Sequence, residues 1–239
     1  VCKMNVTIIG YGKMGKEVEK VLVSRGHKIL KIIDSNDNIF DFKNCDVAII
    51  FSSPNSVYKH IKNCLDLNIP VICGSTGWLE KLEEIKKYCK SLSGAFLFAP
   101  NFSIGVNLFF KVNNYLSKIM KDHKDYKLNI IEKHHIQKVD KPSGTAIKLA
   151  DDIIANSNYS KWILDKESRE NDINIKSYRE GVEKGFHEVI YSSENDVISI
   201  SHNAKNRHSF ALGSVIAAEF IHGKKGVFSI DDVILNLKL

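Results

Sequence analysis

Short apolar runs alternate with helical segments over the first hundred residues, and this alternation limits the possible folds more than any other feature of the chain. The apolar runs are Val6–Ile9, Ile29–Ile33, Val47–Phe51, Ile69–Cys73 and Ala95–Ala99. Helical patterns separate them at residues 14–23, 55–67 and 79–90. Nearly continuous apolar strands between helices are typical of a parallel sheet covered on both faces. Right-handed crossovers then predict a Rossmann-type, doubly wound α/β domain.

The pattern changes after about residue 103. Helical spacing occurs at 105–121 and Ser143–Ala155, and Lys127–Glu132 has the pattern of a strand. Residues 173–202 hold two or three strand-like runs, including His187–Tyr191 and Val197–Ser201. Strand after strand with few helices predicts an inserted α+β domain with a mixed sheet. Residues 210–222 return to a helix, and 227–237 form a short closing segment.

Composition excludes several classes of protein. The chain has 239 residues, of which 44% are hydrophobic, enough for a large core. It has no apolar run long enough to span a membrane and no secretory signal, so we expect a cytoplasmic protein. The net charge is +6, but the lysines are scattered among acidic residues, unlike the basic stripe of a nucleic-acid binder. Five cysteines without a CxxC pair predict free thiols and no metal site.

A glycine loop follows the first predicted strand and opens a helix. Gly10, Gly12 and Gly15 form GxGxxG, and Asp34 ends the second predicted strand. In this context the glycines permit a tight turn, close approach of a pyrophosphate and close packing of the helix. A carboxylate at the position of Asp34 takes the ribose hydroxyls. The unit predicts a nicotinamide or related dinucleotide as cofactor.

Asp34 also bears on the choice between NADH and NADPH. Its carboxylate repels a 2′-phosphate, and Ser35-Asn36 supplies no cation to offset that repulsion. We therefore expect NADH to be favoured over NADPH. Lys13, in the glycine loop, is the residue that could pair with the extra phosphate instead.

Residues 132–146 bring several chemically active side chains into one short segment. His134 and His135 lie at or just past the end of a predicted strand, and Lys138 follows them. Ser143 or Thr145 could cap the next helix, whose backbone N–H groups are suited to a carboxylate. Histidine transfers protons near neutral pH, and lysine adds a compact positive charge. The segment predicts a site that holds a small acidic molecule and gives it a proton.

The same residues carry a resemblance to a known family. His134-His135-x-x-Lys138-x-Asp140-x-Pro142-Ser143-Gly144-Thr145-Ala146 resembles the signature of dihydrodipicolinate reductase, also called 4-hydroxy-tetrahydrodipicolinate reductase. Further pieces match in order over nearly the whole chain. They are the glycine loop, Gly74–Gly77, Ala99–Ser103, Gly105-Val106-Asn107, Tyr178-Arg179-Glu180-Gly181 with Gly185 and His187, and the stretch from His202 to Gly213.

The resemblance implies reduction of 4-hydroxy-tetrahydrodipicolinate, via dihydrodipicolinate, to tetrahydrodipicolinate in lysine and diaminopimelate biosynthesis. It implies that residues 1–103 and 208–239 bind the dinucleotide, and that 104–207 bind the cyclic imine dicarboxylate and assemble a homotetramer. His134 and Lys138 would be catalytic. Substrate contacts would come from His135, Lys138, Gly144, Thr145 and Arg207. Cofactor contacts would come from Gly10, Tyr11, Gly12, Lys13, Met14, Gly15, Asp34, Gly74, Ser75, Thr76, Ala99, Pro100, Asn101 and Phe102.

Two departures from the family pattern affect the cofactor site: the glycine loop is one residue shorter, and no arginine follows Asp34. Other readings also remain open. Another Rossmann dehydrogenase could share the N-terminal half but gives no reason for the His-His-x-x-Lys segment. A nonenzymatic dinucleotide sensor would need no proton donor.

Overall fold

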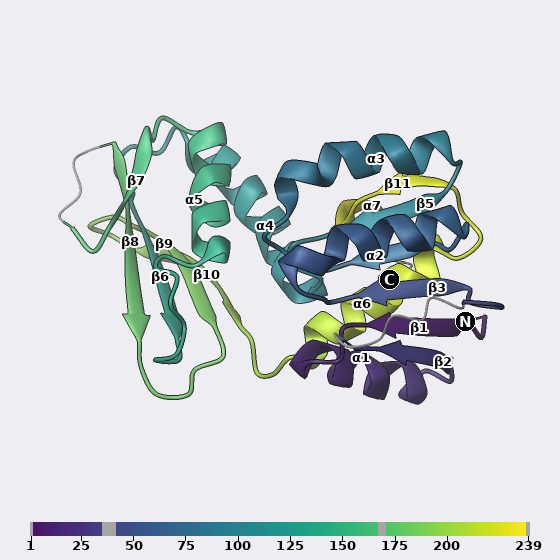
Figure 1. The fold of residues 1–239 in the computed structure, drawn as a ribbon. Helices are drawn as coiled ribbons and strands as arrows, with labels where there is room; N and C mark the ends of the chain where they lie inside the picture. Colours follow the sequence, from purple (N-terminus) through teal and green to yellow (C-terminus); the bar gives the residue numbers. More distant parts are fainter. Residues whose placement is uncertain (1, 35–41, 167–170, 238–239) are drawn as a thin grey trace. The chain divides into compact units, whose positions relative to one another are not determined.

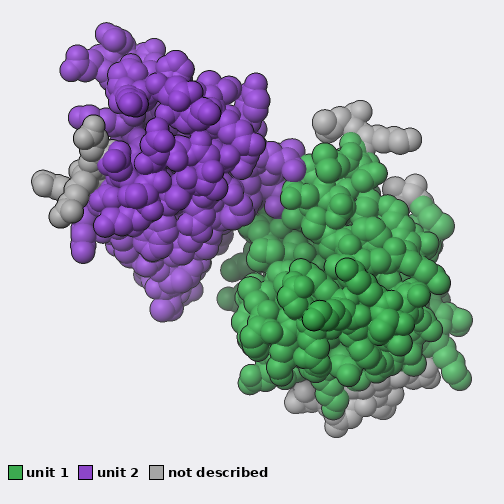
Figure 2. Space-filling view, turned by 90° about the horizontal axis from the view of Figure 1, so that it is seen from above, with its two compact units in different colours: residues 1–104, 207–239 green, residues 105–206 purple. Residues whose placement is uncertain are grey.

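The structure, a computed structural model, describes residues 2–34, 42–166 and 171–237. The chain forms two compact units, the first made of residues 1–104 and 207–239 and the second of residues 105–206 (Figure 2). Each unit has its own sheet and its own hydrophobic core. The two are therefore described separately.

Unit 1 is built on a parallel sheet with the strand order β11-β5-β4-β3-β1-β2 (Figure 1). Its strands are β1 (Asn5–Ile9), β2 (Lys28–Ile33), β3 (Val47–Ile50), β4 (Val71–Cys73), β5 (Ala95–Phe98) and β11 (Gly226–Phe228). From β1 the chain adds β2 on one side, and then β3, β4 and β5 on the other side, so the direction of strand addition reverses between β1 and β3. Such a reversal is the switch point at which ligands bind in open α/β sheets.

Successive residues of a strand point to opposite faces of the sheet, so both faces of this sheet are apolar. Helices cover both of them. Ile8 and Ile49 pack in the core shared with α1 (Lys13–Ser24) and α6 (His208–Ile221). Ile9 and Ile50 pack in the core shared with α2 (Pro54–Asp66) and α3 (Leu82–Ser91). A 3-10 turn, η1 (Leu79–Lys81), leads into α3, and the short helix α7 (Ile230–Leu235) packs with α6.

Unit 2 contains a five-stranded sheet with the order β10-β9-β6-β8-β7. The strands are β6 (Lys127–His134), β7 (Lys161–Leu164), β8 (Asp172–Arg179), β9 (Phe186–Ser192) and β10 (Val197–Asn203). β6 pairs parallel with β8 and antiparallel with β9, so the sheet is mixed. Residues of α4 (Ile104–Met120) and α5 (Gly144–Asn156) complete the core on one face.

The predicted fold class is confirmed: a doubly wound parallel sheet is interrupted by an α+β insert with a mixed sheet. Two details differ from the sequence prediction. β7 was not predicted, and β6 continues two residues past Glu132 because its pairing with β8 extends to His134 opposite Arg179. Among the described residues, no helix is long and apolar enough to cross a bilayer.

Candidate active site

The glycine loop between β1 and α1 is shaped partly by packing and partly by open space. Gly10 has φ 93°, and a Cβ there would lie 2.3 Å from the Phe51 carbonyl oxygen. A Cβ on Gly15 would lie 2.2 Å from the Gly10 carbonyl oxygen. A Cβ on Gly12, by contrast, would have no atom within 4 Å. Packing therefore requires two of the glycines, and the third leaves room for a ligand.

The start of α1 suits the phosphates of a dinucleotide. Gly12 is its N-cap and provides no side-chain hydrogen bond, and the first turn holds no acidic residue. The N–H groups of a first turn have no carbonyl partner within the helix, so they are available to an anion. The residues present thus fit a bound dinucleotide. Tyr11, Lys13 and Met14 lie in this same loop and first turn.

The other predicted cofactor residues lie where strands of the same sheet end. Asp34 follows β2 and is exposed, while the Ser35-Asn36 pair lies outside the described residues. Gly74–Thr76 follow β4, and Ala99–Phe102 follow β5. Because all these strands run parallel, their carboxyl ends share one edge of the sheet. The structure brings these loops to one edge, while their contacts with a cofactor stay a prediction.

These loops are fixed to one another by short contacts. The Ser75 hydroxyl donates to the Ser52 carbonyl at 2.8 Å, and Trp78 donates to the Ser75 carbonyl at 2.8 Å. The rings of Phe51 and Phe102 meet edge to face, with centroids 6.2 Å apart. These contacts give the predicted dinucleotide edge a defined shape.

In unit 2, the buried side chains of β6 change from apolar to polar along the strand. Leu128 and Ile130 point into the core under α5. Glu132 and His134 follow at the same spacing of two, so they lie on the same face but beyond the start of that helix. Both are buried, with 0% and 7% of their surface exposed. The end of β6 thus places a carboxylate and an imidazole where the apolar core ends.

Glu132 is the centre of a hydrogen-bonded cluster. The backbone N–H of Ser143 donates to both carboxylate oxygens at 3.1 Å, and the Ser177 hydroxyl donates to one of them. Arg179 Nη2 donates to Oε1 at 3.0 Å. His134 Nδ1 lies 3.3 Å from Oε2, and His187 Nε2 lies 3.7 Å from it. Burial would raise the pKa of Glu132, but these hydrogen bonds outweigh it, so its pKa lies below the ordinary value.

The two histidines of this cluster contact each other and differ in surroundings. Their rings meet at a centroid distance of 5.0 Å and an angle of 71°. His187 Nε2 lies 3.0 Å from the Ser143 hydroxyl, and burial lowers the pKa of His187. At the other end of the His134 ring, a Cβ built on Gly185 would be 3.2 Å from Nε2. The absent side chain at Gly185 therefore leaves space beside that nitrogen.

The start of α5 adjoins this cluster. Ser143 is its N-cap, and the Ser143 hydroxyl accepts from the Ala146 N–H at 3.2 Å. Gly144 is exposed, and a Cβ there would meet no atom within 4 Å. The sequence left the cap open between Ser143 and Thr145, and the structure assigns it to Ser143. The first turn of α5 thus offers backbone N–H groups beside open space, as an anion site requires.

The turn after β6 positions Lys138. Its ammonium lies 2.7 Å from Asp140 Oδ1, and this contact, against the opposing effect of burial, lowers the pKa of Asp140. Arg179 donates to the carbonyls of Lys138 and Asp140 as well as to Glu132. One guanidinium therefore ties the turn that carries Lys138 to the buried carboxylate.

The structure brings together most of the predicted catalytic and substrate residues. His134, His135, Lys138, Gly144 and Thr145 lie between the end of β6 and the first turn of α5. Arg207 is placed differently: it is the N-cap of α6 and belongs to unit 1. Sequence reasoning gave no role to Glu132, Ser177, Arg179 or His187. The period-two spacing of Glu132 with His134 was the signal that could have indicated the first of them.

Glu132, His134 and His187 also offer three potential metal-ligand atoms within 4.8 Å of one another. The carboxylate already has a cationic partner, because Arg179 Nη2 lies 3.0 Å from Oε1. A cation between the histidines would lie close to that guanidinium charge. The carboxylate is already satisfied by hydrogen bonds and by Arg179, and the absence of a metal stays a prediction.

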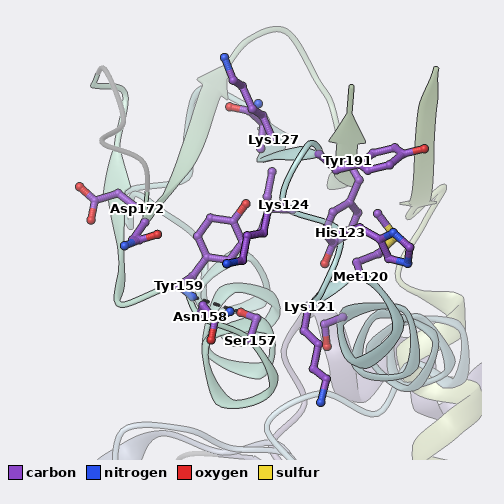
Figure 3. Close-up of a pocket in the computed structure, with 15 residues that line it drawn as sticks. Met120, Lys121, His123, Lys124, Lys127, Ser157, Asn158, Tyr159, Asp172 and Tyr191 are labelled. Atoms are coloured by element: carbon purple, nitrogen blue, oxygen red, sulfur yellow. Dashed lines mark hydrogen bonds between the residues drawn. The ribbon is translucent and has the colours of Figure 1, made fainter. Parts of the chain in front are cut away.

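A separate cavity of about 830 Å³ lies at the other end of the sheet of unit 2 (Figure 3). Its lining includes Lys127 at the start of β6, Asp172 at the start of β8 and Tyr191 near the end of β9. His134 is the last residue of β6, so the whole length of that strand separates this cavity from the cluster. The cavity is therefore distinct from the candidate active site.

A Rossmann-type domain with an open glycine loop, carried in one chain with a buried acid–base cluster, defines an oxidoreductase that uses a nicotinamide dinucleotide. Residues 4–102 match the profile of dihydrodipicolinate reductase, N-terminus, and residues 105–234 match that of dihydrodipicolinate reductase, C-terminus. The chain belongs to the dihydrodipicolinate reductase family, as the sequence resemblance indicated.

Individual relatives are similar to this chain over nearly its full length. A 4-hydroxy-tetrahydrodipicolinate reductase of Christiangramia forsetii is 44% identical over 238 residues, which cover 98% of this chain and 99% of the relative. One from Staphylococcus aureus is 31% identical and covers 96% of this chain and 100% of its own. The solved dipicolinate-bound dihydrodipicolinate reductase of Paenisporosarcina has the same fold, with a TM-score of 0.79, 23% identity and coverage of 95% and 98%.

Proposed function

We propose that this chain reduces 4-hydroxy-tetrahydrodipicolinate, via dihydrodipicolinate, to tetrahydrodipicolinate in lysine and diaminopimelate biosynthesis. The observation that carries the proposal is the position of His134, buried at the end of β6 beside the Ser143-capped start of α5. This pairs a proton-transfer group with an anion-binding helix terminus, as a dicarboxylate ring requires. The relatives carry the name of this activity, and one solved relative is titled as dipicolinate-bound.

The residues of unit 2 have distinct tasks in this reaction. Loss of water from the substrate gives a conjugated C=C–C=N ring with two carboxylates. The glycine loop would hold the dinucleotide, which would provide the hydride for the ring carbon remote from nitrogen. The resulting negative charge needs a proton, and His134 and Lys138 are the acids proposed to stabilise the charge and provide it. His135, Lys138, Gly144 and Thr145 are proposed to hold the carboxylates, together with Arg207 from unit 1.

The finer assignments belong to the same proposal. NADH is favoured because Asp34 places a carboxylate after β2, where a 2′-phosphate would otherwise bind. A homotetramer assembled through unit 2 is supported by exposed apolar side chains on its strands, such as Tyr178 and Val197. A cytoplasmic location agrees with the free thiols of Cys2, Cys45, Cys64, Cys73 and Cys89. Sedimentation of the purified chain would test the tetramer.

One assay tests the activity. NADH and NADPH oxidation is followed on the product of a dihydrodipicolinate synthase reaction, with pyridine-2,6-dicarboxylate as a competitor. We expect turnover with either dinucleotide, a higher kcat/KM for NADH, and competitive inhibition by the planar dicarboxylate. Dinucleotide binding without turnover would instead support a sensor, and turnover only on other substrates would support another dehydrogenase.

A further inference from the structure

Glu132 is fully buried, and the proposed reaction gives it no task. Taking a carboxylate out of water costs several kcal/mol unless charges and hydrogen bonds compensate it. Here the compensation comes from every element around it: His134 on β6, Ser143 on α5, Ser177 and Arg179 on β8, and His187 on β9. A carboxylate that stays ionised and is held in place by these groups can stabilise a neighbouring group that gains a positive charge. Near neutral pH, a histidine is the kind of partner that does so.

We propose that Glu132 is a positioning residue for His134. It fixes the imidazole with the proton on Nδ1 and stabilises the ring when it becomes charged. The proposal rests on the proposed function of His134 as acid and base. Oε2 of Glu132 lies 3.3 Å from Nδ1. Nδ1 makes no well-aligned hydrogen bond among the described residues, so this carboxylate is the acceptor within reach.

The geometry at Nε2 agrees with this role. Gly185 has φ 147°, and its missing side chain leaves space beside Nε2, 3.2 Å from where a Cβ would be. With the proton on Nδ1 facing Glu132 at 3.3 Å, the neutral ring accepts a proton at Nε2, and the charged ring donates one there. Acid and base chemistry are thereby confined to the nitrogen that has free space beside it.

Of the two imidazoles near Oε2 of Glu132, that of His134 is the closer, with Nδ1 at 3.3 Å against 3.7 Å for His187 Nε2. Arg179 and the Ser143 N–H hold the carboxylate ionised, and burial lowers the pKa of His187, which disfavours the charged form of that second imidazole. Ser143 is also the N-cap of α5. One carboxylate thus couples the proton-transfer group to the helix start proposed to bind the substrate's carboxylate.

The first test compares Glu132→Gln with Glu188→Gln, which makes the same change on the neighbouring strand β9 at a residue outside the cluster. We expect Glu132→Gln to lower kcat on the order of 100-fold, within the range of general-acid catalysis, with the KM for dinucleotide unchanged. Because an amide does not stabilise the charged ring, the decline of kcat toward high pH should begin at lower pH than in the wild type. Glu188→Gln should leave both unchanged.

A merely structural role is separated by a double-mutant cycle. If Glu132 acts through His134, adding Glu132→Gln to His134→Gln should reduce kcat by no more than about 2-fold, because residues that act as a unit are non-additive. A multiplicative loss, or an unshifted pH profile in the single variant, would overturn the proposal. Normal turnover of Glu132→Gln while His134→Gln is inactive would overturn it and leave the proposed function intact.

A measurement on the wild-type chain does not depend on the variants folding. The ¹⁵N chemical shifts of the His134 ring, recorded at a pH at which the imidazole is neutral, report which nitrogen carries the proton. We expect the Nδ1–H tautomer, set by the acceptor at that nitrogen. The Nε2–H tautomer would refute the positioning role. Absence of any turnover in the wild type, with the Nδ1–H tautomer observed, would refute only the proposed function.

Discussion

Arg179 is the group whose removal should most reveal how the cluster is stabilised. Its guanidinium donates to Glu132 at 3.0 Å, to Ser177 Oγ at 2.9 Å and to the carbonyls of Lys138 and Asp140. The Arg179 side chain is 15% exposed and that of Glu132 is 0% exposed. Arg179→Met keeps most of the apolar stem but removes the charge. Glu132 would then be a buried anion without its cation.

The size of the effect follows from this geometry. Breaking one partner of a buried ion pair costs about 3–5 kcal/mol, because the remaining charge stays desolvated. The carbonyls of Lys138 and Asp140 belong to a turn that is partly exposed, so water can replace their donor, and they add little. We therefore expect Arg179→Met to lower the free energy of unfolding by about 3–5 kcal/mol. The corresponding fall in Tm is about 6–20 °C.

Urea titration and thermal unfolding of matched variants measure this loss. Lys176→Met is the control, because Lys176 is exposed on the same strand and should change stability by less than about 0.5 kcal/mol. If the uncompensated carboxylate is the cause, Arg179→Met with Glu132→Gln should be no less stable than Arg179→Met alone. The reasoning is refuted if Arg179→Met costs less than about 1 kcal/mol, or if the two substitutions destabilise additively.

Three further predictions test other parts of the structure. Gly185→Ala should lower kcat without changing the KM for dinucleotide, because its Cβ would lie 3.2 Å from His134 Nε2; steady-state kinetics with unchanged kcat would contradict this. Gly12→Ala should raise the KM for dinucleotide and leave Tm unchanged, because a Cβ there meets no atom within 4 Å. Gly15→Ala should lower Tm, because its Cβ would lie 2.2 Å from the Gly10 carbonyl oxygen. The reverse pattern would show that the loop is misassigned. Burial lowers the pKa of His202, so the unfolded chain binds its proton more readily, and stability should fall as pH drops below about 6.5. Urea midpoints at pH 7 and pH 5 should therefore differ less in His202→Gln than in the wild type, and an equal difference would count against this.

The Rossmann half of the fold could be predicted because its signals are local. Runs such as Val47–Phe51 are apolar at every position, as expected for strands buried on both faces, and the glycine loop follows the first strand directly. β7 was missed because its exposed and half-buried residues give no such pattern. The substrate segment was recognisable because its histidines, lysine and helix cap are close in sequence.

The partners of that segment could not be predicted, because they come from other strands. Ser177 and Arg179 reach Glu132 only through the pairing of β6 with β8, and His187 only through the pairing with β9. Strand pairing is set by the tertiary fold, and the composition of each strand does not specify its partner. Arg207 shows the same limit, since two compact units meet in sequence at that residue and the structure places it with unit 1.

The position where α5 begins explains why the chemistry is found at the end of β6. Under the body of α5 the sheet face must be apolar, and Leu128, Ile130 and Val189 fill it. Where α5 begins, the N–H groups of its first turn need acceptors. A buried carboxylate at residue 132 meets this need through the Ser143 N–H and, in the same position, lies against His134. The group that satisfies the start of the helix is therefore also the group that can orient the imidazole, so removing it should affect both stability and proton transfer.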